Sequence, residues 1–265
     1  MKKRIFAVVM AAVVAFAMFG CGSKTDDKPA ASTQAATEAA TSGKVFEIAT
    51  DTTFAPFEFQ DKDGNYVGID MDIIRAIAED QGFQVKINPL GFSAALAAVE
   101  SGQADGVIAG ASITEERQKT YDFSDPYYTA DVAMAVAKGS DIKEYKDLEG
   151  KNVAIKTGTN GGDFAKSIMD KYGFTVTEFE DSSNMYQDVI VGNSVACFED
   201  YPVMAYGIQQ GLELQLVDGI KEAGSQYGFA VKKGENAELL AMFNKGLKNI
   251  KDNGKYDEIV DKYTK

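Results

Sequence analysis

The chain has 265 residues, of which 45% are hydrophobic and 25% charged, and its formal net charge at pH 7 is −13. This composition is ordinary for a globular protein of one large or two modest domains. The negative charge repels phosphate backbones, which argues against nucleic acid as a partner. The sequence contains no histidine, so the most common general base of enzymes is missing.

The N-terminus has the pattern of an export signal. A basic start, Met1-Lys2-Lys3-Arg4, precedes an apolar run over residues 5–19 that is too short for a confident membrane span. The run ends at Gly20-Cys21, which resembles a bacterial lipobox. The resemblance implies that residues 1–20 are a lipoprotein signal peptide and that Cys21 carries the lipid. An ordinary secretory peptide cut at another position is the alternative.

The next segment, residues 21–43, carries no large apolar side chain and is expected to be a disordered tether. The second cysteine of the chain, Cys197, lies in an apolar run and has no partner if Cys21 is lipidated. No disulfide framework is therefore expected.

Strand-like and helix-like segments alternate from residue 44 onward. In the first half, Asp63-Gly64-Asn65 predicts a hairpin turn and not a calcium loop, because no bidentate glutamate follows at the twelfth position. Ser93 is expected to cap a helix. Strands are predicted over residues 45–49, 84–90 and 105–109, and helices after Asp70 and after Ser93.

The pattern starts again beyond Tyr128. Strands are predicted over residues 132–137, 153–156, 175–179, 195–198, 214–217 and 227–231. Helices are predicted from the opening segment 157–162 to residue 172 and over 183–191, 202–210, 237–250 and 256–263. This alternation indicates an α/β protein with a largely parallel core in each of two units.

One stretch in the middle of the chain points to chemistry. Thr114 is a good N-cap, which places Arg117 in the first turn of a helix, where the helix dipole disfavours a cation. An arginine at that position is suited to binding an anion. The alternative is a solvated side chain offset by Glu115 and Glu116.

The segment Gly110-Ala111-Ser112-Ile113-Thr114-Glu115-Glu116-Arg117, followed by Asp122-Phe123-Ser124 and Tyr127-Tyr128, resembles a family signature. The family is the bacterial extracellular solute-binding proteins of family 3, which serve ABC importers of polar amino acids, and the resemblance covers roughly residues 44–265. It implies a two-lobed, periplasmic-binding-protein-like fold of type II with a hinge between the lobes. Lobe 1 would comprise residues 44–127 and 228–265, and lobe 2 residues 131–223.

The same resemblance implies roles for individual residues. Arg117 would fork onto the α-carboxylate of the ligand, and Asp200 would bind its ammonium group with help from the Gly110 carbonyl. Local alternatives are that Asp200 only caps a helix, that residues 157–162 form a plain glycine-rich turn, and that the phenylalanines pack in a core. The implied ligand-binding residues are Asp51, Phe54, Phe92, Gly110, Ser112, Arg117, Lys156, Thr159, Asn160 and Asp200.

Lys156 and Asp51 bear on the identity of the ligand. The resemblance implies that Lys156 faces the far end of the ligand's side chain, with Asp51 on the opposite wall. A lysine donates to an oxygen and an aspartate accepts from an N–H group, which together match the amide of glutamine. If Glu199 turns inward, its charge could cancel that of Lys156 and admit arginine or lysine, so a basic amino acid is the alternative.

The expected function is capture of an amino acid and its delivery to a membrane permease by a monomeric protein with no cofactor or metal. The expected location is the extracellular face of the cell membrane, through the lipid anchor, or the periplasm. A cyclohexadienyl-dehydratase-like enzyme is a second possibility, although the usual nucleophile and base pairs are missing. A sensor ectodomain is disfavoured, because no signalling segment is expected after the last predicted helix.

Overall fold

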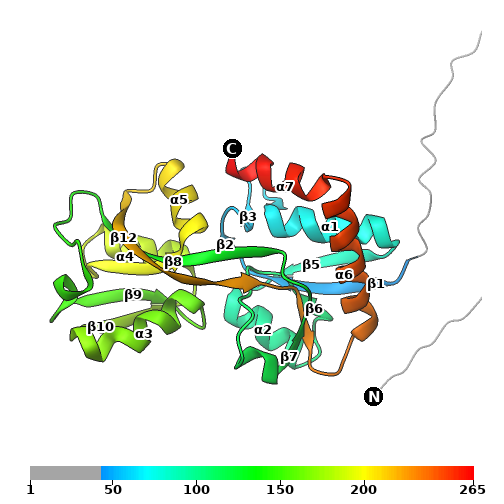
Figure 1. Cartoon of the computed structure of the whole chain (residues 1–265), viewed down its shortest axis with the longest axis horizontal. Helices are drawn as coiled ribbons and strands as arrows, with labels where there is room; N and C mark the ends of the chain where they lie inside the picture. The colour runs from blue at the N-terminus through cyan, green and yellow to red at the C-terminus, as the bar shows by residue number, and fades with distance from the viewer. Residues whose placement is uncertain (1–42) are drawn as a thin grey trace, which may run out of the picture. The chain divides into compact units, whose positions relative to one another are not determined.

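The computed structural model describes residues 43–265. The predicted signal peptide, Cys21 and the tether up to residue 42 lie outside the described residues. The described chain forms two five-stranded sheets and one three-stranded sheet, with helices packed around them (Figure 1). None of the helices within residues 43–265 is long and apolar enough to cross a membrane.

The first sheet has the strand order β5-β1-β6-β13-β7. Its centre is parallel, because β1 pairs in parallel with both β5 and β6, whereas β13 pairs antiparallel with β6 and β7. The strands are β1 (Val45–Thr50), β5 (Gln84–Pro89), β6 (Gly106–Val107), β7 (Tyr121–Phe123) and β13 (Ala230–Lys232).

Helix α1 shows why the helices of this half form where they do. It spans Ile69–Gln81, and Ile69, Ile73 and Ile77 recur on one face and are all 0% exposed. Gly82 ends the helix in the left-handed conformation, with φ of 74°. The other helices here are α2 (Phe92–Glu100), α6 (Ala237–Asp252) and α7 (Lys255–Thr264), and the small sheet comprises β2 (Thr53–Phe54), β3 (Glu58–Gln60) and β4 (Tyr66–Val67).

The second sheet has the order β10-β9-β11-β8-β12. Strands β10 and β11 pair with β9 in parallel, and β8 pairs antiparallel with β11 and β12, so each large sheet is mixed and not largely parallel as predicted. The elements are β8 (Tyr128–Ala137), β9 (Asn152–Lys156), β10 (Thr175–Phe179), β11 (Ala196–Asp200), β12 (Leu214–Tyr227), α3 (Asn160–Tyr172), α4 (Ser182–Ile190), α5 (Tyr201–Gln209) and the short 3₁₀ helix η2 (Tyr145–Leu148).

We call the first sheet with its helices and the small sheet the first lobe, and the second sheet with its helices the second lobe. The chain passes between them twice, through β8 and β12, which run side by side as the long central pair in Figure 1. Both strands are longer than the sequence pattern predicted. Bulges between Leu216 and Lys221, and between Glu222 and Ser225, interrupt the pairing and hide the alternation of apolar residues in β12.

Two local predictions are wrong. The helix expected after Thr114 is only one turn of 3₁₀ helix, η1 (Arg117–Lys119), because strand β7 begins at Tyr121. The Thr114 hydroxyl nevertheless accepts from the Arg117 N–H group at 3.2 Å. Ser93 does not cap α2, which begins one residue earlier, and its hydroxyl donates instead to the Thr157 carbonyl of the second lobe at 3.4 Å.

Candidate ligand-binding site between the two sheets

Polar residues collect where the strands of both sheets end. Asp51 follows β1, Gly110 and Ser112 follow β6, and Lys156 and Asp200 are the last residues of β9 and β11. In α/β proteins ligands bind at this edge, outside the carboxyl ends of the strands. A narrow cavity lies there and is lined by Asp51, Phe54, Phe92, Ala109, Gly110, Ser112, Arg117, Lys156, Thr159, Asn160 and Asp200. All ten residues that the sequence singled out therefore lie around one cavity.

Arg117 reaches across the cavity from the first lobe. Its Nη1 donates to the Ser112 carbonyl at 2.9 Å and its Nη2 to the Gly158 carbonyl of the second lobe at 2.7 Å. The guanidinium lies over the ring of Phe92, at 5.2 Å from its centroid. Burial lowers the pKa of Arg117, and the charges of Asp163 and Asp200 oppose that effect. The guanidinium has five N–H groups, so donors remain for a carboxylate in the cavity.

Asp200 also lines the cavity, is buried, and does not cap α5 with its side chain. The hydroxyl of Tyr227 donates to its Oδ2. Burial raises the pKa of Asp200 to about 7, and the charge of Glu199 adds to this effect. A cation placed beside Asp200 would favour its ionised form and be held by it.

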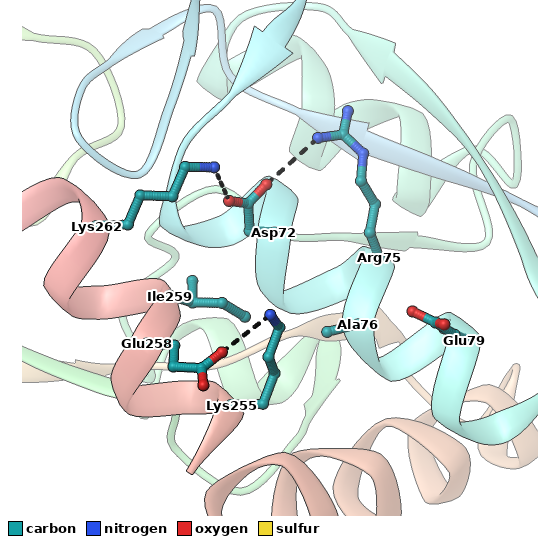
Figure 2. A pocket seen from close by; sticks show the side chains of 8 residues that line it. All are labelled: Asp72, Arg75, Ala76, Glu79, Lys255, Glu258, Ile259 and Lys262. Carbon is teal, nitrogen blue, oxygen red and sulfur yellow. Dashed lines mark hydrogen bonds and ion pairs between the residues drawn. The ribbon is translucent and has the colours of Figure 1, made fainter.

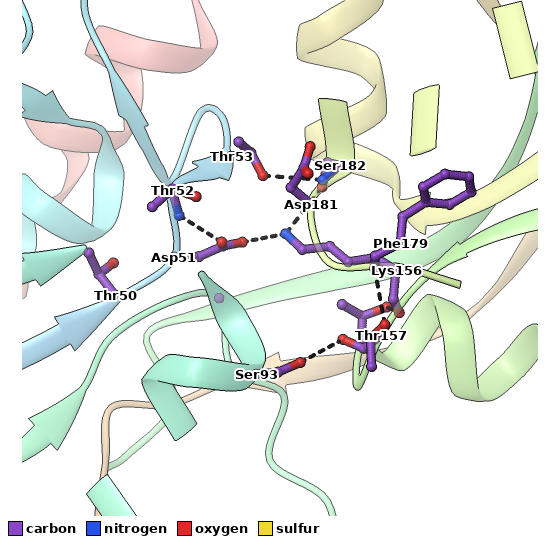
Figure 3. A network of polar contacts seen from close by, with 12 residues as sticks. Thr50, Asp51, Thr52, Thr53, Ser93, Lys156, Thr157, Phe179, Asp181 and Ser182 are labelled. Atoms are coloured by element: carbon purple, nitrogen blue, oxygen red, sulfur yellow. Dashed lines mark hydrogen bonds and ion pairs between the residues drawn. The ribbon is translucent and has the colours of Figure 1, made fainter. Parts of the chain in front are cut away.

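Lys156 and Asp51 form an ion pair in which each side chain is only 1% exposed. They extend toward each other from different lobes, as Figure 3 shows, and the Asp51 carboxylate also accepts from the N–H group of Thr52 at 2.6 Å. The sequence interpretation placed them on opposite walls, and the structure has them in direct contact. The Lys156 ammonium also lies 5.3 Å from the ring centroid of Phe54.

Glu199 is buried next to Asp200 but does not line the cavity. Its carboxylate accepts from Ser182 Oγ at 3.1 Å, from the Tyr186 hydroxyl at 2.9 Å and from the Asp200 N–H group at 3.0 Å. Ser182 also accepts from Lys156 Nζ at 3.2 Å, so one hydroxyl links the lysine to Glu199. Burial raises the pKa of Glu199, while Lys156 and the three donors oppose the rise.

The remaining predicted residues supply the rest of the wall. Thr159 caps α3 by accepting from the Gly162 N–H group at 3.2 Å, which leaves the first N–H groups of the helix directed out of its N-terminus. Ser112 Oγ accepts from Ser225 Oγ at 2.5 Å, and the rings of Phe54 and Phe92 are 5% exposed each.

Several residues that shape the site gave no recognisable signal in the sequence. Tyr227 and Ser225 come from the returning strand β12, and Ser182 and Tyr186 from α4. Each reaches the site through a contact with a residue far away in the chain, and no local motif marks such a contact. The sequence interpretation read Asp70 only as the start of a helix, although it is buried and accepts from the Gly110 N–H group at 2.8 Å.

A second hollow, between α1 and α7, has the wrong chemistry for a charged ligand (Figure 2). Most of its charges already pair with each other: Asp72 with Lys262 at 2.7 Å and with Arg75 at 3.7 Å, and Lys255 with Glu258 at 3.1 Å. In the part of the chain that the structure describes, no group of three or more acidic, cysteine or histidine side chains is arranged to hold a metal ion.

Two α/β lobes joined by paired strands, with a polar cavity where their sheet edges meet, are the architecture of a two-lobed solute-binding protein. The chain belongs to the bacterial extracellular solute-binding proteins, family 3, whose family model matches residues 46–265.

Three similar proteins illustrate this relationship. The arginine-binding extracellular protein ArtP of Bacillus subtilis is 31% identical over 99% of this chain and 98% of that protein. The second substrate-binding domain of GlnP from Lactococcus lactis, solved in an open conformation, is 44% identical over 84% of this chain and 96% of that one, with a TM-score of 0.60. An ancestral arginine-binding protein bound to glutamine is 40% identical over 83% and 97% of the two chains, with a TM-score of 0.77.

Proposed function

We propose that this protein is the substrate-binding component of an ABC importer for polar amino acids and that its ligand is glutamine. The observation that carries the proposal is the cavity, which places an arginine fork, a buried carboxylate and a lysine–aspartate pair around one small space.

Two charged residues that line the cavity match the charges common to all amino acids. Arg117 has free N–H groups for the α-carboxylate, and Asp200 is positioned to accept from the α-ammonium group. Buried charges are costly unless they are paired, so a ligand with both charges is favoured over one with a single charge.

The Lys156–Asp51 pair supports a neutral side chain with an amide. The carboxamide oxygen of glutamine can accept from Lys156, and its N–H group can donate to Asp51, so the amide can enter the pair without leaving either charge unsatisfied. Burial shifts the pKa of Glu199 upward, and a protonated Glu199 would keep the charges of the cavity balanced around a neutral ligand.

One observation favours a basic amino acid as a second candidate. Glu199 is connected to Lys156 through Ser182, and an ionised Glu199 would offset the lysine's charge. The similar proteins described above support both candidates. ArtP is named for arginine binding, and the ancestral arginine-binding protein was solved with glutamine bound.

The capture mechanism that we propose is closure of the lobes around the ligand. Two contacts at the cavity, Arg117 with Gly158 and Lys156 with Asp51, connect the lobes. The chain also superposes better on the ligand-bound ancestral protein than on the open GlnP domain, although its sequence identity to the GlnP domain is higher. Both observations support a closed arrangement here, with β8 and β12 as the hinge. On this proposal lobe 1 comprises residues 44–127 and 228–265, and lobe 2 residues 131–223.

The proposed partners are the amino acid, the permease subunits of the importer and, through lipid on Cys21, the outer face of the cell membrane. We further propose that the protein is a monomer and is not an enzyme. ArtP is named as a binding protein, although one solved relative is an ancestral amino-acid-binding precursor of cyclohexadienyl dehydratase. A turnover assay with prephenate and arogenate tests the enzymatic alternative.

The ligand is tested by competition among glutamine, glutamate, arginine and lysine on the wild type and on Lys156→Met. We expect the wild type to prefer glutamine and Lys156→Met to lose this preference. The matched control is Lys166→Met, which removes an exposed lysine of α3 that pairs with Glu178. Wild-type preference for arginine or lysine would transfer the assignment to the second candidate.

A further inference from the structure

Two carboxyl groups lie buried behind the wall of the cavity. Glu58 on β3 and Asp70 in the first turn of α1 are each 0% exposed. Neither lines the cavity, and neither forms an ion pair with a lysine or arginine of the described chain. A pair of acids in such a place is costly and calls for a physical explanation.

Asp70 is bonded to the cavity wall. Its Oδ2 accepts from the Gly110 N–H group at 2.8 Å and from the Tyr127 hydroxyl at 2.8 Å. Gly110 has φ of 53°, and a Cβ atom there would lie 2.4 Å from the ring of Phe54, so the backbone passes through a position that only glycine fits. Ala109 and Gly110 both line the cavity, and Asp70 holds the peptide between them from the core side.

The other carboxyl oxygens show how the pair is stabilised. Both oxygens of Glu58 and Oδ1 of Asp70 have no hydrogen-bond donor among the described residues. Ionised carboxylates only accept, whereas a protonated carboxyl donates one hydrogen bond. A proton on Glu58 would supply a hydrogen-bond donor for these oxygens and remove one buried charge.

The surrounding charges agree with this assignment. Burial and the negative charges of Asp70 and Asp51 raise the pKa of Glu58 well above its usual value, and Lys156 opposes them only in part. Burial also raises the pKa of Asp70, to about 6, while its bonds to Gly110 and Tyr127 restrain the rise. These shifts favour a proton on Glu58, with Asp70 as its acceptor.

We propose that Asp70, held by a proton that it shares with Glu58, is a positioning residue for the ligand: it fixes the Gly110 peptide in the wall that meets the bound amino acid. This inference rests on the proposed function, because it requires the cavity to bind an amino acid. Asp70 does not touch the ligand and acts through Gly110.

Two substitutions at residue 70 separate positioning from stability. Asp70→Ala removes the acceptor of the Gly110 N–H group, and we expect the affinity for glutamine, measured by calorimetry, to fall about tenfold or more. Asp70→Asn keeps an oxygen acceptor and should bind within about threefold of the wild type. Tyr127→Phe is the matched control, since it removes the other donor to Oδ2 and leaves the Gly110 contact in place. Normal binding by folded Asp70→Ala would overturn the proposal.

If Asp70→Ala does not fold, substitutions at Glu58 decide. Glu58→Gln supplies an amide N–H donor to Asp70 that does not depend on protonation, so this variant should retain binding. Glu58→Leu has no donor, so this variant should bind the ligand more weakly. Equal affinity in these two variants would contradict the shared proton.

Amide hydrogen exchange of the ligand-free protein distinguishes failure of this inference from failure of the proposed function. The Gly110 amide should be protected in the wild type and in Glu58→Gln, and should exchange faster in Glu58→Leu, with the Ile108 amide, which bonds to the Ala49 carbonyl at 3.1 Å, unchanged as a reference. We expect this exchange pattern even if no amino acid binds to the protein. An unprotected Gly110 amide in the wild type would refute the positioning role.

Discussion

The ammonium group of Lys156 pairs with the carboxylate of Asp51, although the two residues are 105 positions apart in the chain and belong to different lobes. Removal of one member of a buried ion pair leaves an unpaired buried charge, at a cost of about 3–5 kcal/mol. In this protein the cost can be avoided, because opening of the lobes would return Asp51 to water. Under the proposed lobe closure, we therefore expect the pair to stabilise the closed arrangement more than the folded state.

The first prediction follows from this pair. Lys156→Met without ligand should shift the protein toward the open arrangement, because the closed one leaves Asp51 buried and unpaired. Small-angle X-ray scattering should show a larger radius of gyration, while the melting temperature changes little. The exposed-lysine variant Lys166→Met should scatter like the wild type. An unchanged radius of gyration together with a large fall in melting temperature would mean that the pair stabilises the fold and not the closure.

The second prediction concerns the arginine fork. Arg117→Ala should weaken amino-acid binding about 100-fold or more, because the ligand's carboxylate is left without its charged partner. Lys119→Ala is a suitable control, since Lys119 lies in the same short helix and its exposed side chain pairs with Glu116. Calorimetry measures both variants, and circular dichroism verifies that they fold. Equal affinities in the two variants would exclude Arg117 from the site.

The third prediction is a pH dependence set by Asp200. The ligand-free carboxyl has a pKa raised to about 7, and a bound ammonium group requires it to be ionised. Below this pH, binding must release a proton, so the affinity should fall as the pH decreases, by about tenfold per unit in the limit, and level off above it. Calorimetry in buffers of different ionisation enthalpy measures the released proton. An affinity that rises at acid pH would contradict the role given to Asp200.

The fourth prediction separates the two cysteines. Cys21→Ser should release the protein from membranes into the medium or the soluble fraction, because no residue remains to carry the lipid. Cys197→Ser should leave the protein at the membrane. Cys197 is buried and its thiol has a raised pKa, so it should also resist thiol reagents in the native protein. Lipid labelling that persists in Cys21→Ser would refute the lipid attachment.

The sequence predicted well those elements that have a local signal. The start of α1 was predicted to within a residue or two, and the strands of the second lobe, β9 to β11, were predicted to within two residues at each end. The helix after Thr114 was predicted too long, because a good capping residue does not reveal that β7 follows so soon. Strands β8 and β12 were predicted too short, because their bulges and their passage between the lobes break the periodic pattern.

The candidate site shows the same limit. Residues at strand ends, such as Asp51, Lys156 and Asp200, could be proposed from the fold class and the family signature. Their contacts could not be predicted from the sequence, because the Lys156–Asp51 contact and the Tyr227–Asp200 contact depend on how the two lobes meet. The buried pair Glu58 and Asp70 was missed for a similar reason. In the sequence, an acid at the start of a strand is interpreted as solvent-exposed, and an acid at the start of a helix as a capping residue.

Calorimetry of the ligand-free protein against each of the twenty amino acids tests the central claim most directly. The account predicts saturable binding at one site per chain, strongest for glutamine and lost in Arg117→Ala and Asp200→Ala variants that remain folded. Absence of binding to every one of the twenty amino acids, or normal binding in both variants, would contradict it.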